Sequence, residues 1–245
     1  LALASHPPQP GDLALRFALL ATDHVPRALV TAVETAWGCT VYNHYGMTEM
    51  GLGGGVDCAA RRGYHLREAD LFVEIVDPAT GSPLPNDQAG EIVFTTLTRR
   101  GMPLIRYRTG DAGRFIREPC PCGTALKTLA HVTHRFDNVM PMPGGALPLS
   151  ALDEVLFPIT GLVDFAADFI PNKLTVTLAA HRDPDVVSEA RAALLSLPTI
   201  TQAVAAGGLH VDIDLAPVSA PSPAKRTFND RRIQVTCPLS LPLDD

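Results

Sequence analysis

Two short segments of the sequence combine glycine with hydroxyl and carboxylate side chains, which are groups able to hold a nucleotide and its magnesium ion. The first is Tyr45–Glu49, which reads Tyr-Gly-Met-Thr-Glu. Gly46 lets backbone approach a ligand closely, the Thr48 hydroxyl can bond a phosphate oxygen, and Glu49 can help hold magnesium. The second segment ends in Asp111, a carboxylate that can accept both hydroxyls of a ribose. Each alone also fits a turn with solvated polar groups, so the argument depends on their occurring together.

A second set of side chains has the composition of a metal site: Cys58, His65, Cys120 and Cys122. Three thiolates and one imidazole suit tetrahedral zinc, and four protein ligands would close the site and make it structural. The alternative is that the cysteines are buried small hydrophobes and His65 lies on the surface. His131 and His134 also lie close in sequence, but without a neighbouring cysteine or carboxylate pair. We interpret both as structural, with His134 near the nucleotide.

The segment Tyr45–Glu49 must be positioned by an α/β layer. Residues Arg16–Thr22 form an apolar run that predicts a buried strand, and Val25–Trp37 has the spacing of an amphipathic helix. Pro26 in the first turn and Gly38 after the last support these ends. Thr40–Tyr45 alternates as another short strand, so Tyr45–Glu49 follows a strand end.

The next stretch predicts a β-rich unit, because apolar residues alternate between turn-forming prolines and glycines. Strands are expected at Leu71–Val76, Glu91–Thr95, Leu104–Tyr107 and Gly113–Arg117. Prolines and glycines then cluster again at residues 141–145, which suggests a hinge at about Arg135–Gly145.

A small α+β domain follows the hinge. Its expected elements are a helix at Ser150–Leu156, a hairpin of Val163–Ile170 and Lys173–Ala179, a helix at Asp185–Leu197 and a strand at Leu209–Leu215. The predicted organisation is therefore the end of an α/β subdomain (1–57), a β-rich subdomain (58–134), a hinge (135–145) and a small α+β domain (146–245).

The overall composition limits the function classes. The chain has 245 residues, of which 46% are hydrophobic and 19% charged, with a net charge of -6. Basic residues are scattered, which argues against nucleic acid as the main partner, and the apolar runs are too short to span a membrane. The amino terminus lacks a secretory signal and an initiating methionine, and we interpret it as a cut end or an ordered start. Five cysteines fit a reducing cytoplasm better than a paired disulfide framework.

Three segments together resemble the adenylate-forming superfamily of acyl-CoA synthetases, luciferases and peptide-synthetase adenylation domains. They are Tyr-Gly-Met-Thr-Glu at 45–49, Gly-Glu-Ile-Val-Phe-Thr-Thr-Leu at 90–97 and Pro-Leu-Ile-Arg-Tyr-Arg-Thr-Gly-Asp at 103–111. They are most similar to the phenylacetate-CoA ligase branch, and the resemblance runs from about Leu15 to Arg232. It implies the carboxyl-terminal part of an adenylate-forming enzyme fold, with the last domain as a lid.

The resemblance also implies roles for individual residues. Tyr45 and Gly46 would lie at the adenine, Thr48 would touch the α-phosphate, Glu49 would help bind magnesium and Asp111 would hold the ribose. The segment His134–Asn138 matches a hinge motif Gly-Arg-x-Asp-Asp, in which Arg135 would be a ribose or phosphate ligand and Asp137 the pivot. His134 and Asn138 depart from that motif, which puts hinge behaviour in doubt.

Two further residues come from the resemblance. Lys225 matches the family lysine that reaches into the site from the small domain, and Asp23, in Ala21–Asp23, falls where the family has an adenine-stacking turn. Magnesium, Arg135 and Lys225 would offset the charge that develops when a carboxylate attacks the α-phosphate, so Lys225, Thr48 and Arg135 are the candidate catalytic residues. Several relatives also share the Cys…His…Cys-Pro-Cys-Gly pattern of the predicted zinc site.

One family signature is missing: a Ser/Thr/Gly-rich loop ending in Pro-Lys that binds the outer phosphates of ATP. Sequence before Leu1 is therefore expected to be needed for catalysis, and this chain alone is expected to be inactive. The predicted function is a portion of an ATP-dependent ligase that activates an aromatic or similar carboxylic acid as an acyl-adenylate and transfers it to coenzyme A or a carrier-protein thiol. The alternative is a non-catalytic AMP-binding or interaction module, or half of a split enzyme with a partner chain.

Overall fold

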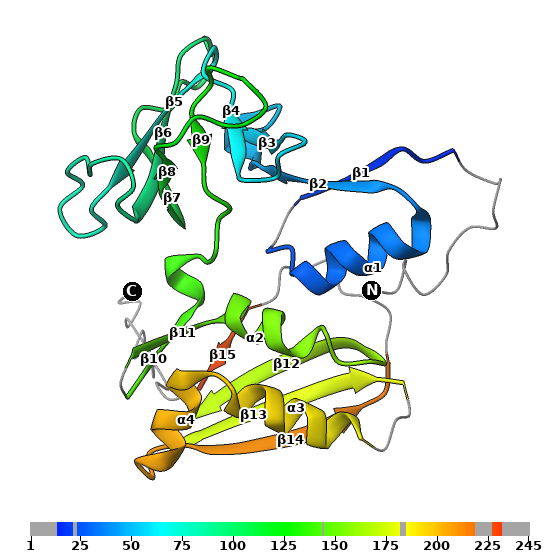
Figure 1. The fold of residues 1–245 in the computed structure, drawn as a ribbon. Coiled ribbons are helices and arrows are strands. Elements are labelled where there is room, and N and C mark those ends of the chain that lie inside the picture. The colour runs from blue at the N-terminus through cyan, green and yellow to red at the C-terminus, as the bar shows by residue number, and fades with distance from the viewer. Residues whose placement is uncertain (1–13, 22–23, 144, 182–184, 219–226, 232–245) are drawn as a thin grey trace, which may run out of the picture.

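The computed structural model describes residues 14–21, 24–143, 145–181, 185–218 and 227–231. Figure 1 shows three parts: a pair of strands covered by one helix, a β-rich unit continuous with them, and a final α+β domain that one chain segment connects to the β-rich unit. No helix in these described ranges is long and apolar enough to cross a membrane.

The first part is a strand-helix-strand crossover, as predicted, but the first strand is not buried as expected, because no described element covers the face that carries Phe17 and Leu19. Strand β1 (Phe17–Leu20) pairs in parallel with β2 (Thr40–Tyr45), and helix α1 (Arg27–Trp37) connects them. Gly38 ends the helix in the left-handed conformation, with φ of 62°, and its N–H bonds to Glu34. The crossover directs the carboxyl end of β2, and therefore Tyr45, into the β-rich unit.

That unit contains two sheets. Four short strands extend the first sheet in the order β1-β2-β3-β4-β9-β8: β3 (Gly55–Asp57), β4 (Tyr64–Leu66), β9 (Thr128–Leu129) and β8 (Phe115–Ile116). The second sheet is antiparallel and consists of β5 (Leu71–Val76), β6 (Gly90–Thr96) and β7 (Tyr107–Gly113). Their shared core is apolar and includes Leu66, Ile92, Phe94 and Leu129, each at most 1% exposed.

The strand predictions for β5 and β6 are confirmed, and β8 lies within the strand expected at Gly113–Arg117. The strand expected at Leu104–Tyr107 is wrong, because β7 begins at Tyr107 and occupies the stretch that follows. Its polar Arg-Thr-Gly-Asp segment remains in the sheet because other atoms satisfy it: the Thr109 hydroxyl donates to the Ile92 carbonyl at 2.8 Å, and Gly110 N–H donates to Glu91 at 3.1 Å. Apolar alternation cannot reveal such a strand.

The chain then reaches the final domain through a short 3-10 turn, η2 (Phe136–Asn138), and a hairpin of β10 (Val139–Met142) and β11 (Gly145–Pro148). Met140 and Met142 belong to the core of the final domain. Most of the predicted hinge segment is therefore packed structure, and only residues before Val139 lie between the two cores. A hinge at this place stays a prediction.

The final domain places α2 (Leu149–Leu156), α3 (Val186–Leu195) and α4 (Pro198–Ala205) against a four-stranded sheet (Figure 1). The sheet order is β14-β13-β12-β15, formed by β12 (Leu162–Ile170), β13 (Lys173–Ala180), β14 (His210–Ala216) and β15 (Asn229–Asp230). The predicted hairpin, first helix and last long strand are confirmed. Helix α4 was missed; Pro198 begins it at a position where proline is well tolerated.

The final domain also contacts the first part of the chain. His24 Nε2 lies 2.9 Å from Glu154 Oε1 on α2, and the Arg27 N–H lies 3.4 Å from the other carboxylate oxygen. Beside this contact, an open groove of about 780 Å³ separates α1 from the turn that joins α2 to β12.

Candidate functional site

Three residues from distant parts of the chain meet at one carboxylate. The Tyr45 hydroxyl, at the end of β2, donates to Asp111 Oδ2 at 2.8 Å. Arg135, on the segment leading to the final domain, places Nη1 at 3.2 Å from Asp111 Oδ1. Asp111 is only 5% exposed, so both contacts form with little competition from water. The structure thus brings together three residues that the sequence proposed for the nucleotide.

Asp111 owes its position to a neighbouring residue that the sequence analysis did not single out. Glu91, on β6, is 4% exposed; one carboxylate oxygen accepts the Gly110 N–H, and the other accepts the Arg108 guanidinium, with Nε at 2.7 Å. This buried acid fixes the backbone immediately before Asp111. The signal was present in the sequence, since Glu91 lies within the motif at 90–97, but its partner could not be identified without the pairing of β6 and β7.

The Tyr45 ring is mostly inside the protein. It is 8% exposed and packs 5.7 Å from the Tyr64 ring, measured between centroids. Burial, followed by the nearby Asp111 carboxylate, raises the pKa of Tyr45 far above its ordinary value, so the hydroxyl remains a donor at all working pH values. Its visible role is to orient Asp111. The predicted contact with adenine stays a prediction.

Arg135 attaches the connecting segment to strand β7. Besides Asp111, its guanidinium reaches the Thr109 carbonyl and Asp137, each at 3.2 Å, and Ala112 N–H bonds to the His134 carbonyl. Burial disfavours the charge of Arg135, but Asp111 and Asp137 outweigh this effect and raise its pKa. The arginine therefore carries a permanent positive charge beside the carboxylate.

The Thr48–Glu49 pair lies in a 3-10 turn, η1 (Thr48–Met50), immediately after β2. Met50 is 1% exposed and anchors the turn, while Thr48 is exposed and Glu49 partly buried. Glu49 faces the Tyr107 hydroxyl at 3.4 Å. Tyr107 and Asp111 are both on β7. That strand therefore faces the Thr48–Met50 turn through Tyr107 and also carries the candidate ribose-binding carboxylate.

Glycine is needed where this turn folds back on β2. A Cβ at Gly46 would lie 2.9 Å from the Gly53 Cα, and a Cβ at Gly54 would lie 2.5 Å from the Met50 sulfur. Gly46 therefore allows direct contact between two backbone segments, and Gly54 leaves room for the buried Met50 side chain. Of the other predicted site residues, Asp23 and Lys225 lie outside the described residues.

The four predicted metal ligands also come together. Their ligand atoms lie within 4.8 Å of one another, with Cys58 Sγ 3.5 Å from Cys120 Sγ and Cys122 Sγ 3.3 Å from His65 Nε2. Ligands around tetrahedral zinc are separated by about 3.4–3.8 Å, from metal bonds of about 2.0–2.3 Å. The Thr128 hydroxyl lies 3.2 Å from His65 Nδ1, where it can fix the ring with Nε2 toward a metal. The donor set and spacing therefore fit zinc.

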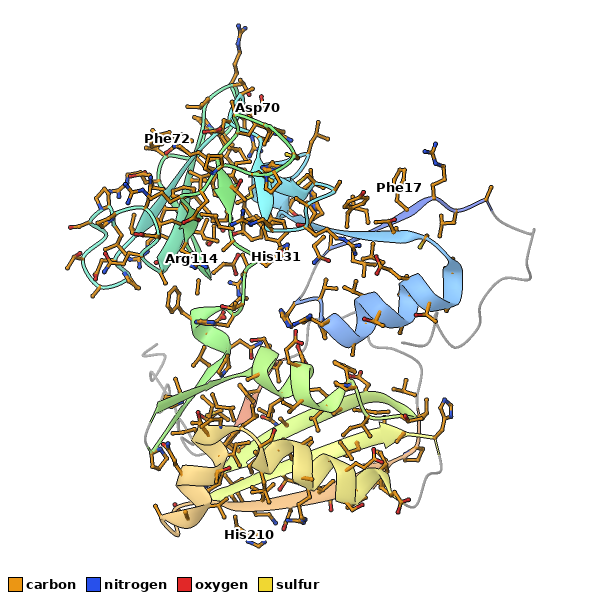
Figure 2. All side chains as sticks on the ribbon, viewed as in Figure 1. Phe17, Asp70, Phe72, Arg114, His131 and His210 are labelled. Carbon is orange, nitrogen blue, oxygen red and sulfur yellow. The ribbon has the colours of Figure 1, made fainter. Side chains whose placement is uncertain are left out.

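The structure shows a partner of His131 that the sequence analysis did not identify, and this contact agrees with a structural role. The sequence showed no carboxylate partner, but His131 Nε2 lies 2.6 Å from Asp57 Oδ1, and the second Asp57 oxygen accepts the Asn43 N–H at 2.9 Å. These partners are far apart in the chain, which is why the pair was missed. His131 lies on the side of the β-rich unit that faces the final domain (Figure 2).

The α/β edge, the β-rich extension and the small α+β domain together resemble the carboxyl-terminal architecture of adenylate-forming enzymes. Residues 2–97 match the family of AMP-binding enzymes. The chain is 35% identical over 157 residues to phenylacetate-coenzyme A ligase of Thermus thermophilus, and 33% identical over 149 residues to that of Aromatoleum evansii. These matches cover 63% and 60% of this chain. The resemblance to the phenylacetate-CoA ligase branch is confirmed.

Solved structures confirm the fold class. The chain resembles 2-hydroxyisobutyryl-CoA ligase in complex with R3-HIB-AMP, with a TM-score of 0.72 and 20% identity over 87% of this chain and 48% of that one. It also resembles anthranilate CoA ligase in complex with anthranoyl-AMP, with a TM-score of 0.59 and 13% identity over 85% and 43%. The chain spans only about a third of the curated relatives, 35% and 33% of their lengths.

Proposed function

We propose that this chain supplies the adenosine-binding and magnesium-binding side of an ATP-dependent acid-CoA ligase, which activates a carboxylic acid as an acyl-adenylate and transfers it to coenzyme A. The observation that carries the proposal is the convergence of Tyr45 and Arg135 on the buried carboxylate of Asp111. The relatives named above, which are phenylacetate-CoA ligases, support the reaction class.

In this proposal Asp111 accepts the ribose hydroxyls, held in place by its two protein partners. Arg135 adds a fixed positive charge beside the nucleotide, which favours the negative charge of the transition state. The Thr48 hydroxyl bonds the α-phosphate. Glu49 helps hold magnesium, which when bound supplies positive charge at the phosphate oxygens. Lys225 approaches from the final domain as the second protein cation.

The acid is proposed to be aromatic, because the named relatives act on phenylacetate and the structural neighbours include anthranilate and benzoate CoA ligases. Coenzyme A is the proposed thiol acceptor, and a carrier-protein thiol is the alternative. A cytoplasmic location stays a prediction.

AMP binding measured by calorimetry tests the site. We expect the chain to bind AMP, and Asp111→Asn to weaken binding at least about tenfold, since a charge-assisted hydrogen bond to the ribose is lost. Asp137→Asn is the matched control: Asp137 also contacts Arg135, but its side chain is 71% exposed, so little change is expected. No AMP binding, or equal effects of the two substitutions, would refute the proposed site.

We also propose a structural zinc ion at Cys58, His65, Cys120 and Cys122, tying β3 and β4 to the turn between β8 and β9. Metal analysis of protein purified without added zinc should give close to one equivalent. Cys120→Ser should lose the metal, whereas Cys39→Ala, at a buried cysteine outside the cluster, should retain it. Less than a few tenths of an equivalent in the unsubstituted protein would contradict the site.

Half of a split enzyme is the second candidate, favoured by an exposed apolar sheet face. Phe17 and Leu19 on β1 are 63% and 53% exposed, and the Phe17 side chain lies on the face of β1 turned away from α1 (Figure 2). Acid-dependent pyrophosphate exchange provides the test. We expect none from this chain alone and activity when a polypeptide with the Pro-Lys phosphate loop is added; exchange by the chain alone would contradict the proposal.

A further inference from the structure

Arg99 lies beside the turn that carries Thr48 and Glu49, the candidate phosphate and magnesium ligands. A Cβ added at Gly51, directly after η1, would lie 3.1 Å from Arg99 Nη2. Gly51 also has φ of 75°, which other residues rarely adopt. The glycine therefore leaves room for a guanidinium close to the backbone of Thr48–Met50.

The loop that carries Arg99 is held in place at its base. The Leu97 N–H donates to the Asp70 carbonyl at 2.8 Å, and the Thr98 hydroxyl donates to the Asp70 carboxylate at 2.9 Å. Asp70 lies at the end of the β-rich unit far from the final domain (Figure 2). These two hydrogen bonds therefore fix the backbone immediately before Arg99, on the loop that brings its guanidinium beside Gly51.

A second arginine reaches the same turn, and the comparison is informative. Arg67 Nη2 approaches the Met50 carbonyl at 3.5 Å, and its Nε lies 2.8 Å from the Asp70 carboxylate, so its charge is compensated. Arg99 is partly buried, yet within the described residues no carboxylate lies within ion-pair distance of it. A partly buried guanidinium without a carboxylate at ion-pair distance is suited to bind an anion, and its planar fork matches phosphate oxygens.

We propose that Arg99 binds a phosphate group of the nucleotide. The inference rests on the proposed function and extends it, because it adds a third protein cation to Arg135 and Lys225. Two contacts support it: Tyr107, on the strand that carries Asp111, faces Glu49 at 3.4 Å, and Arg99 lies beside Gly51, directly after the Thr48–Met50 turn. A nucleotide with its ribose at Asp111 would direct its phosphates toward Arg99.

Calorimetry with adenosine, AMP and magnesium ATP tests the inference. We expect Arg99→Met to weaken binding of a phosphate-bearing nucleotide about tenfold and leave adenosine unchanged, because only the phosphate loses a partner. Arg99→Lys, which keeps the charge but not the fork, should give a smaller loss. Arg100→Met, at the exposed neighbouring arginine, controls for net charge and should stay within about twofold.

The binding results for Arg99→Met distinguish a phosphate-binding role from a structural one. A loss of affinity for both AMP and ATP supports the proposal and places the guanidinium at the inner phosphate. A loss of affinity for ATP alone also supports it and places the guanidinium at the outer phosphates. Equal affinity of Arg99→Met and the unsubstituted chain for AMP and ATP overturns the inference while the proposed function stands. A parallel loss of adenosine affinity also overturns it, since that would show a structural role. Failure of the unsubstituted chain to bind AMP overturns the proposed function and the inference with it.

Discussion

Replacing Tyr45 by phenylalanine removes only the hydroxyl that donates to Asp111. The ring continues to fill the same space, so no cavity forms beyond one oxygen atom. A hydrogen bond to a charged group contributes roughly 1.5–3 kcal/mol, and Asp111, at 5% exposure, cannot easily recruit water in exchange. Arg135 remains at 3.2 Å and retains part of the stabilisation. We therefore expect the β-rich unit to lose about 2 kcal/mol of its free energy of unfolding.

Tyr107→Phe is a matched control for this substitution. Its hydroxyl lies 3.4 Å from Glu49, which is long for a hydrogen bond, and Glu49 is only partly buried. The same chemical change should therefore cost less than about 0.5 kcal/mol, as for most surface substitutions. The two variants separate the effect of losing a tyrosine hydroxyl from the effect of losing this contact.

Hydrogen exchange measured by mass spectrometry suits a chain with two cores, because it reports the opening free energy of peptides within β6 and β7 separately from the final domain. AMP affinity should be measured in parallel. If Tyr45 orients Asp111, Tyr45→Phe lowers both protection and AMP affinity; if the ring acts only as an adenine platform, phenylalanine retains AMP affinity. Equal protection in the Tyr45 and Tyr107 variants would refute the reasoning.

Three further substitutions test neighbouring contacts. Thr128→Val removes the partner of His65 Nδ1 and should weaken zinc binding about 10–100-fold in competition with a chromophoric chelator; unchanged affinity would show that Thr128 does not orient the His65 ring. Glu91→Ala removes the buried acceptor of a backbone N–H and a guanidinium and should cost about 2 kcal/mol in denaturant unfolding. Glu68→Ala also removes the acceptor of a backbone N–H, but its side chain is 34% exposed, so it should cost less than about 1 kcal/mol; equal losses would count against the role of Glu91. Burial lowers the pKa of His134, so the unfolded chain takes up a proton at this residue before the folded chain does as the pH falls. The stability that His134 contributes above about pH 6.5 is therefore lost as the pH falls. His134→Asn should flatten this part of the dependence of stability on pH, and an unaltered pH dependence would exclude this cause.

Apolar periodicity in the sequence predicted those helices and strands that bury one face in a core. The hairpin of β12 and β13 and the strand β5 alternate buried and more exposed positions because one face of each is packed, whereas β6 is buried on both faces and is rich in β-branched and aromatic residues, which favour a strand. Strand β7 lacks such a pattern, since its polar groups are satisfied by hydrogen bonds from β6. Strands of two or three residues, such as β4 and β9, were also missed, because pairing with distant strands rather than local preference stabilises them.

Residue chemistry and spacing were enough to name Tyr45, Asp111 and Arg135 and to group three cysteines with one histidine. They could not show what each side chain faces. Tyr45 and Asp111 are separated by 66 positions, and Cys58 and Cys120 by 62. Contacts over such distances depend on sheet register, which the whole core sets.

The sequence by itself therefore determined the types of chemical group, the local periodicity and the class of enzyme that the chain resembles. Only the tertiary structure decided that Tyr45 orients a carboxylate, that Glu91 fixes the strand beneath it and that Arg99 lies over the Thr48–Glu49 turn. The physical reason is that a local pattern reports which face of an element is buried, whereas direction and partner are fixed when separate elements pack against one another.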